Sequence, residues 1–384
     1  MKILHVVPTY LPATRYGGPI YSVHGLCKAL AMRNHRVHVF TTNIDGSQYS
    51  DVPLDRPVAI DNVEVHYFAP ALGRRLYRSP AMAERLESSI TSFDIVHLHS
   101  VFLWPTTMAA RASVRSQVPY VLSPRGMLVN DLIKRKSRLP KLGWLMLFER
   151  RNIWDASAIH ATSESEVDEL RRLGIATRHV VVIPNGVDPP DLSGADEAHG
   201  RPYILSLGRL NWKKGLDRLI RAMVHVDGVD LLIAGNDEEN HQTQLEDIAR
   251  SAGIAHRIRF VGPVHGEKKW ALLKGATLFA LPSHSENFGN SVLEAMACSC
   301  AVVITPQVGL ARHVQAAEAG LVVDGDPKTL ARALSDLMSD PQRRLRMGEN
   351  GRRIAEENYS WATIAQQMEE MYLQILKSRP REAA

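Results

Sequence analysis

The stretch that most constrains the fold runs from Ser283 to Ile304, with the sequence SHSENFGNSVLEAMACSCAVVI. It begins where the apolar run LFALPS ends and closes in a second apolar run, AVVIT. Each run is typical of a strand buried on both faces of a parallel sheet. Between them we expect a loop over 283–290 and a helix from Ser291 to Ala297. This order predicts a strand–loop–helix–strand unit with a right-handed crossover.

Two glutamates bracket this unit, Glu286 in the loop and Glu294 on the helix. Taken singly, either residue is more often solvated than functional. Glu294, however, lies on an otherwise apolar helix, where a buried carboxylate is costly unless donors such as ribose hydroxyls surround it. The backbone N–H groups at the helix start can face an anion, and they belong to Phe288, Gly289, Asn290 and Ser291.

The segment SENFGNSVLEAMA resembles the E-x(7)-E motif of retaining glycosyltransferases of family 4. Members of that family have the GT-B fold, in which two Rossmann-like, doubly wound α/β domains face each other across a cleft. The resemblance implies that Glu286 contacts the hydroxyls of the donor sugar and that Glu294 holds the nucleotide ribose. It also implies that residues 288–291 form part of the donor site.

Length and composition fit a globular protein of two domains, because 384 residues exceed one ordinary core and 45% of them are apolar. No apolar run reaches 18 residues, so no transmembrane helix is expected. The start MKILHVVPTYLP lacks the features of a secretory signal. Cys27, Cys298 and Cys300 fall in expected core elements and are too few for a disulfide framework, which favours a reducing cytoplasm.

Strands and helices alternate over the first half of the chain, which predicts a parallel, doubly wound sheet. Expected strands cover 3–8, 37–41, 63–68, 95–98, 118–123 and 158–162, and a helix covers about 20–32. Gly17 and Gly18 precede that helix. They form either a flexible turn or a loop whose backbone closely approaches a phosphate or an acceptor. The glycine pair before a helix ending in NHRV resembles the opening of family 4.

His97 and His99 lie in DIVHLHS, at the carboxyl end of an expected strand, where doubly wound sheets bind ligands. Both face one side of the strand, but no third metal ligand is evident nearby, so a structural role is favoured over a metal site. The resemblance implies that His99 contacts the donor sugar. Arg125, in SPRGM after a later strand, either binds an acidic group of the acceptor or pairs with a local carboxylate.

Positive charge is concentrated in residues 72–151, which carry fourteen Lys and Arg against five Asp and Glu in a chain of net charge +5. The densest part, LIKRKSRLPKLGWLMLFERR at 132–151, interleaves basic and large apolar residues. It is either a solvated helix face or a surface helix on an anionic membrane, where each basic residue contributes roughly 1 kcal/mol. Nucleic acid is the weaker alternative because no nucleic-acid-binding fold accompanies the charge.

The segment IPNGVDPPDLSGADEAHGRP, at 183–202, is rich in Pro, Gly and Asp, as linkers are. We therefore place an acceptor-binding domain at 1–182 and a nucleotide-sugar-binding domain at 183–360. IPNGVD also resembles the interdomain segment of family 4. The resemblance further implies that a C-terminal helix, at about 361–384, packs back on the first domain.

Arg209 and Lys214 lie in GRLNWKKG, between an expected strand at 203–207 and a helix start. Bases that converge on a helix start would stabilise the charge that develops on a phosphate as a glycosidic bond breaks. Removing one such donor typically costs ~3–4 kcal/mol of transition-state stabilisation. The segment G-R-L-x-x-x-K-G, beginning at Gly208, resembles the diphosphate-binding motif of family 4, which implies that role for Arg209 and Lys214.

Two further segments bear on the donor site. FVGPV, at 260–264, resembles the family segment whose backbone reads the nucleotide base, so Val264 is expected in the donor site. Asp324 and Asp326 form a D-x-D pattern, but Asp326 before Pro327 is typical of a helix cap, and no metal is expected there.

The sequence thus predicts an enzyme that moves a hexose from a GDP- or UDP-linked donor to a glycan or lipid-linked hydroxyl. The resemblance implies retention of configuration, no metal or other cofactor, and a same-face displacement in which the leaving phosphate helps deprotonate the acceptor. We expect a role in cell-surface polysaccharide or lipopolysaccharide synthesis, in the cytoplasm or at the inner face of the plasma membrane. The alternatives are a nucleotide-sugar epimerase or hydrolase of the same fold, or a non-catalytic regulator that binds sugar nucleotides.

Overall fold

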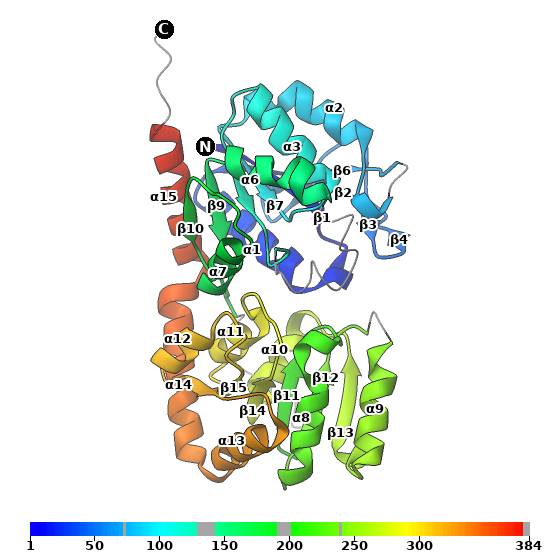
Figure 1. Cartoon of the computed structure of the whole chain (residues 1–384), viewed down its shortest axis with the longest axis vertical. Helices are drawn as coiled ribbons and strands as arrows, with labels where there is room; N and C mark the ends of the chain where they lie inside the picture. The colour runs from blue at the N-terminus through cyan, green and yellow to red at the C-terminus, as the bar shows by residue number, and fades with distance from the viewer. Residues whose placement is uncertain (72–73, 129–142, 190–200, 238–239, 379–384) are drawn as a thin grey trace. The chain divides into compact units, whose positions relative to one another are not determined.

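The computed structural model describes residues 1–71, 74–128, 143–189, 201–237 and 240–378. The chain divides into two compact units (Figure 1). One unit consists of Met1–Gly186 together with Trp361–Ala384, and the other of Val187–Ser360. None of the helices in these described ranges combines the length and apolarity needed to cross a membrane.

The first unit is built on an eight-stranded sheet in the order β10-β9-β8-β7-β1-β2-β6-β5. Its neighbouring strands are parallel except for the β5–β6 pair. The strands are β1 (Lys2–Thr9), β2 (Arg36–Thr42), β5 (Val58–Ile60), β6 (Val63–Phe68), β7 (Ile95–His99), β8 (Tyr120–Ser123), β9 (Ala158–Ala161) and β10 (Val180–Val182). A separate hairpin joins β3 (Ile44–Asp45) and β4 (Gln48–Tyr49). The six strands predicted for this half are all present, with bounds within two residues of those expected.

Helices cover both faces of this sheet because successive residues of each strand point to opposite sides. Along β1, Ile3 and Val7 pack into the core under α1 (Gly18–Met32), whereas Leu4 and Val6 pack into the core under α2 (Pro80–Ser89) and α3 (Trp104–Arg115). The remaining α-helices in the described part of this unit are α6 (Arg150–Asp155), α7 (Glu164–Arg172) and α15 (Trp361–Lys377). Both faces are therefore apolar, as the unbroken apolar strands predict.

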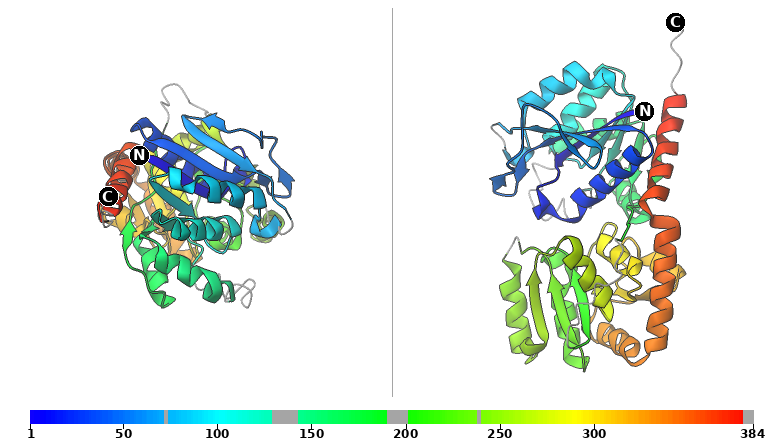
Figure 2. Two further views of the ribbon diagram at one scale, coloured as in Figure 1. Left: turned by 90° about the horizontal axis from the view of Figure 1, so that it is seen from above. Right: turned by 180° about the vertical axis from the view of Figure 1, so that it is seen from behind.

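Helix α15 lies beside α1 although it comes from the other end of the chain (Figure 2). Ile364, Met368 and Tyr372 recur every four residues and share the core under α1. The Tyr372 hydroxyl lies 2.6 Å from Nδ1 of His97 on β7. At the surface, Arg33 forms an ion pair with Glu369.

The second unit is a six-stranded, wholly parallel sheet in the order β13-β12-β11-β14-β15-β16. Its strands are β11 (Tyr203–Leu207), β12 (Asp230–Ala234), β13 (Ile258–Gly262), β14 (Leu278–Leu281), β15 (Val302–Ile304) and β16 (Gly320–Val322). Its helices are α8 (Leu216–Ala222), α9 (His241–Ser251), α10 (Gly266–Gly275), α11 (Asn290–Ala297), α12 (Ala311–Ala316), α13 (Pro327–Ser339) and α14 (Pro341–Tyr359).

The predicted strand–loop–helix–strand unit is present as β14, α11 and β15, with α11 beginning one residue earlier than expected. The predicted cap is also present, because the Asp326 carboxylate accepts hydrogen bonds from the backbone of Lys328 and Thr329 at 3.1 and 3.0 Å. This explains the D-x-D pattern without a metal.

Two glycines allow the carboxyl ends of β11 and β12 to meet. Gly235 has a φ of 150°, and a Cβ at this position would lie 1.8 Å from the carbonyl oxygen of Gly208. A Cβ at Gly208 would in turn lie 3.2 Å from Nζ of Lys214. The two strand ends therefore pack more closely than a side chain at Gly235 allows, and the Lys214 side chain packs against Gly208.

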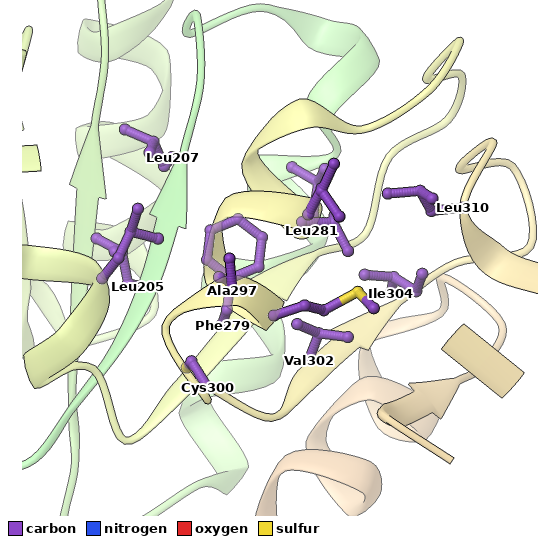
Figure 3. Close-up of a cluster of buried hydrophobic side chains, with 14 of the residues drawn as sticks. Leu205, Leu207, Phe279, Leu281, Ala297, Cys300, Val302, Ile304 and Leu310 are labelled. Atoms are coloured by element: carbon purple, nitrogen blue, oxygen red, sulfur yellow. The ribbon is translucent and has the colours of Figure 1, made fainter. Parts of the chain in front are cut away.

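One face of this sheet carries the core shown in Figure 3. Leu205, Phe279 and Val302 come from three adjacent strands. Two residues further along each strand, a second apolar side chain points to the same face: Leu207, Leu281 and Ile304. Ala297 of α11 and Leu310 close the cluster. This packing fixes α11 against β14 and β15.

We expect Phe279→Ala to lower the free energy of unfolding of the second unit by about 3–5 kcal/mol, because the ring is fully buried and its loss leaves a cavity. Chemical denaturation followed by circular dichroism measures this change. The control Leu345→Ala, at a side chain 59% exposed on α14, should change stability by less than about 0.5 kcal/mol. Equal effects of the two substitutions would contradict the assignment of the core.

Candidate active site

An ion pair between Lys214 and Glu286 stands at the carboxyl edge of the second sheet. Lys214 ends a short 3-10 turn that follows β11, and Asn211 caps this turn by accepting a hydrogen bond from the Lys213 N–H at 3.1 Å. Glu286 lies in the loop after β14, 72 residues further on. The two side chains are 16% and 21% exposed. Of the four residues that the sequence analysis assigned to one donor site, the structure brings these two into direct contact.

Backbone hydrogen bonds tie the loop that carries Glu286 to two neighbouring segments. The Glu286 N–H donates to the Gln307 carbonyl at 3.0 Å, and its carbonyl accepts from Gly309 at 3.0 Å. On the other side, the His284 N–H donates to the Lys213 carbonyl at 2.6 Å. The loop is thus tied both to the segment after β15 and to the lysine turn, so the ion pair is preorganised.

Arg209 follows β11 directly and is exposed at the same edge of the sheet. Since β11 and β14 are neighbouring strands, the segments with Arg209, Lys214 and Glu286 leave adjoining strand ends. A small hollow at this edge is lined by Gly208 and Lys214 among others, but not by Arg209, Glu286 or Glu294.

Glu294 has a partner that the sequence analysis missed. Its Oε1 lies 2.9 Å from Nζ of Lys269 on α10, and the two side chains are 20% and 19% exposed. We expected ribose hydroxyls to donate hydrogen bonds to this carboxylate. The Lys269 ammonium already donates one. The only available signal was the basic segment EKK that opens α10.

The start of α11 differs in detail from the prediction. Gly289 caps the helix with a φ of 102°, and Asn290 is its first residue. Phe288 is 4% exposed and its ring packs near Tyr359, with ring centroids 6.3 Å apart. Val264 is also buried, at 7% exposure. A ligand could therefore meet Phe288 and Val264 through their backbone but not through their side chains, while Ser291 is partly exposed.

In the first unit, His99 is buried and both of its ring nitrogens are in contact with other side chains. Its Nε2 lies 2.9 Å from Nδ1 of His5, and its Nδ1 lies 3.3 Å from the Arg125 guanidinium. His97 stacks on His99, with ring centroids 4.2 Å apart. Burial and the Arg125 charge hold the pKa of His99 well below its usual range, so its ring is neutral.

The expectation that no third histidine lies near His97 and His99 was wrong. β1 and β7 are paired with His5 opposite His97, so three buried rings gather with their nitrogens within 4.8 Å of one another. His99 stacks on both His5 and His97, and the guanidinium of Arg125 disfavours a further cation. This arrangement supports the predicted structural role of the histidines over a metal site.

Arg125 contacts neutral groups. It donates to the side-chain oxygen of Asn185 at 2.7 Å and approaches His99, and among the described residues it forms no ion pair. Burial lowers its pKa to about 10, so it stays charged. Glu166 instead accepts hydrogen bonds from the backbone of Gly126 and Thr162 at 2.6 and 2.8 Å. Of the two predicted alternatives for Arg125, a local salt bridge is therefore not what the structure shows.

Gly17 and Gly18 stand at the start of α1. Gly17 caps the helix with a φ of 67°, a conformation that favours glycine, and Gly18 is its first residue. Pro19 has no N–H, and the N–H groups of Gly17 and Ile20 donate to the carbonyls of Thr14 and Gly17 at 3.0 and 3.2 Å, so at this helix start the Gly18 N–H is the candidate ligand contact.

The basic stretch 132–151 lies partly outside the described residues, which resume at Gly143. In the described part, Met146 and Leu147 are 69% and 72% exposed, next to the exposed Arg150 and Arg151. Glu149, by contrast, is buried and accepts a hydrogen bond from the Phe102 N–H at 2.8 Å. The stretch is thus not a purely solvated face.

Comparison with known proteins identifies the family of the chain. Residues 193–354 match the family described as glycosyl transferases group 1, and residues 16–190 match glycosyltransferase family 4. An alpha-maltose-1-phosphate synthase of Mycolicibacterium smegmatis is 30% identical over 73% of this chain and 79% of its own length. A D-inositol 3-phosphate glycosyltransferase of Xylanimonas cellulosilytica is 29% identical over 99% and 97% of the two chains.

Among solved structures, the Anabaena protein HepE in complex with UDP-glucose superposes with a TM-score of 0.76, at 20% identity, over 97% of this chain and 100% of that one. The two α/β units and this superposition show the GT-B fold, as predicted. The chain belongs to glycosyltransferase family 4.

The buried histidines predict a pH dependence. Burial lowers the pKa of His5 and His160 to about 3, whereas the unfolded chain takes up these protons near pH 6.5. The free energy of unfolding should therefore fall as the pH drops below about 6.5, by up to ~1.4 kcal/mol per pH unit for each such histidine. Denaturation between about pH 5 and about pH 7 measures this slope.

His160→Gln should reduce that slope, because one proton fewer is taken up on unfolding. His256→Gln, at an exposed histidine, is the matched control for the substitution itself. A slope unaltered by His160→Gln would show that folding does not lower the pKa of His160.

Proposed function

We propose that the chain transfers a hexose from a UDP- or GDP-linked donor to a hydroxyl of a glycan or lipid-linked acceptor, with retention of configuration. The observation that carries this proposal is the contact between Lys214 and Glu286. It brings a cation suited to a diphosphate and a carboxylate suited to sugar hydroxyls into one preorganised pair. The complex of the related Anabaena protein with UDP-glucose supports this class of donor.

Arg209 and Lys214 would stabilise the leaving diphosphate. As the bond between the anomeric carbon and the phosphate oxygen breaks, negative charge grows on that oxygen, and fixed cations lower its energy. The lysine ammonium has three donors, so it can keep Glu286 and still reach a phosphate oxygen. Two positive side chains would then do what a metal ion does in other transferases, which supports a reaction without a metal.

Glu286 would accept hydrogen bonds from the donor sugar, and Glu294 from the ribose. We propose a same-face displacement: the acceptor oxygen bonds to the anomeric carbon while its proton passes to the leaving phosphate oxygen. No side chain of the described site is assigned as a nucleophile. Gly208, Val264 and the α11 start would contribute backbone contacts to the donor.

The first unit would supply the acceptor site. Arg125 keeps its charge among neutral partners, which favours an acceptor with an acidic group. This agrees with the phosphorylated acceptor in the name of the Xylanimonas relative. Gly18 would bring its backbone N–H to the same ligand, whereas the Gly17 N–H donates to the Thr14 carbonyl at 3.0 Å and shapes the turn.

We further propose that the enzyme works in the cytoplasm, at the inner face of the plasma membrane, on cell-surface polysaccharide or lipopolysaccharide. Its three cysteines are free, as expected in a reducing compartment, although Cys298 is only partly buried. Exposed Met146 and Leu147 beside Arg150 and Arg151 provide the apolar and basic groups that an anionic leaflet binds.

A donor panel distinguishes the candidate functions. Release of nucleoside diphosphate only when acceptor is present supports transfer, and release without acceptor supports a hydrolase. An altered sugar supports an epimerase, and binding without turnover supports a regulator. NMR of the new anomeric centre tests retention, and assays with a chelator test metal independence.

We expect Lys214→Ala to lower turnover at least ~100-fold, because the leaving diphosphate loses a fixed cation. The control is Lys328→Ala, at an exposed lysine on α13, which should retain activity. Steady-state kinetics and circular dichroism together separate lost chemistry from lost folding. Near-normal turnover by a folded Lys214→Ala would refute the role of Lys214.

We expect Glu294→Gln to weaken nucleotide diphosphate binding by roughly 10- to 100-fold, because a hydrogen bond to a charged group contributes about 1.5–3 kcal/mol. Isothermal titration calorimetry measures this with the free nucleotide. Glu318→Gln, at an exposed glutamate, is the matched control. If both variants bind alike, Glu294 does not hold the ribose.

A further inference from the structure

A second cluster of metal-ligating side chains lies on the first unit, on strands β2 and β6. These strands are parallel neighbours, with His38 opposite Glu64 and Phe40 opposite His66. Because alternate residues of a strand share a face, His38, Glu64 and His66 all project to the same side of the sheet. Figure 1 shows the two strands side by side in this unit.

The three side chains already converge on one point. Nδ1 of His38 lies 3.2 Å from Oε1 of Glu64, and Nε2 of His66 lies 2.8 Å from the same oxygen. The three ligand atoms lie within 4.8 Å of one another. Zinc binds nitrogen and carboxylate oxygen at about 2.0–2.2 Å, which separates the ligands of a tetrahedral ion by roughly 3.3 Å. Small side-chain rotations therefore suffice to admit an ion.

We propose that His38, Glu64 and His66 bind one divalent transition-metal ion, with zinc the best match. Two imidazoles and one carboxylate are a ligand set that zinc, nickel and cobalt accept, whereas magnesium and calcium prefer oxygen ligands alone. Solvent would complete the coordination, because three protein ligands leave one position of a tetrahedron open.

Access favours this cluster. The side chains of His38 and His66 are 13% and 14% exposed and that of Glu64 is 46% exposed, so an ion can enter from solvent. The nearby charges of Lys2 and Arg85 oppose a cation. Nζ of Lys2, however, donates a hydrogen bond to Ser92 Oγ at 3.1 Å.

The other histidine cluster on this unit lacks these properties. His5, His97 and His99 are buried to 1% exposure or less, and the Arg125 guanidinium lies 3.3 Å from His99. An ion there would enter a closed core beside a fixed positive charge. Among the described residues, the β2–β6 cluster is thus the better metal site.

The position of the cluster points to a structural role. His38 and Glu64 lie in the first half of their strands, near the amino ends. His99, Arg125 and Gly17 lie at or beyond the carboxyl ends of theirs, at the opposite edge of the sheet. An ion would cross-link β2 to β6 and stabilise this part of the sheet without entering the proposed reaction, so the inference does not depend on the proposed function.

The test uses the full chain without an affinity tag, stripped of metal with a chelator. Titration with zinc should show saturable binding of one ion at the cluster and a concentration-dependent rise in melting temperature. Cobalt should give a visible absorption band that zinc abolishes. Magnesium should change neither the melting temperature nor the cobalt absorption band.

Glu64→Gln and His66→Ala should each weaken zinc affinity at least ~10-fold. Replacing a residue that only hydrogen-bonds to a metal ligand already lowers metal affinity by about that factor. His256→Ala, which removes an exposed histidine of the other unit, is the matched control and should bind zinc as the wild type does. Circular dichroism checks that each variant is folded.

Two outcomes would overturn the inference. One is the lack of saturable zinc or cobalt binding by the wild-type chain. The other is wild-type affinity in both folded cluster variants, which would place the ion elsewhere. Loss of affinity in the cluster variants but not in the control supports the site.

Discussion

Contact between Lys214 and Glu286 depends on a single topological fact, the adjacency of β11 and β14. From β11 the chain adds β12 and β13 on one side, then crosses back to place β14 on the other. The loops after β11 and β14 therefore diverge, and ligands of parallel sheets bind at such a point. The first unit repeats the pattern at β1 and β7. Gly17 follows β1, and His99 is the last residue of β7. Both sets of candidate residues thus lie where strand order reverses.

In the first unit, buried carboxylates hold the backbone just after strands β7 and β8. Ser100, Phe102 and Arg125 all have positive φ, which is unfavourable for residues other than glycine. Glu149 accepts the Phe102 N–H, and Glu166 accepts the N–H of Gly126, next to Arg125. Burial raises the pKa of Glu149, so this hydrogen bond partly offsets the cost of its charge. Strained turns after β7 and β8 are thus held by buried acids.

The sequence was sufficient for features set by local patterns. Unbroken apolar runs located the strands, and Asp326 before Pro327 located a helix cap. Features set by three-dimensional neighbours were missed. Lys269 meets Glu294 only because α10 packs beside α11, and His5 meets His99 only through the register of β1 with β7. Phe288 and Val264 were placed in the donor site by motif, but the motif could not reveal that their side chains belong to the core.

The first unit is discontinuous in sequence, because Trp361–Lys377 completes it. Met368 and Tyr372 fill the core under α1, and the Tyr372 hydroxyl is the partner of a buried histidine. A ribosome makes this helix after all of the second unit. Until α15 appears, part of the apolar face that it shares with α1 stays uncovered on the N-terminal sheet, whereas the strands and helices of the second unit have already been made. Synthesis thus favours completion of the C-terminal Rossmann-like unit before the N-terminal one.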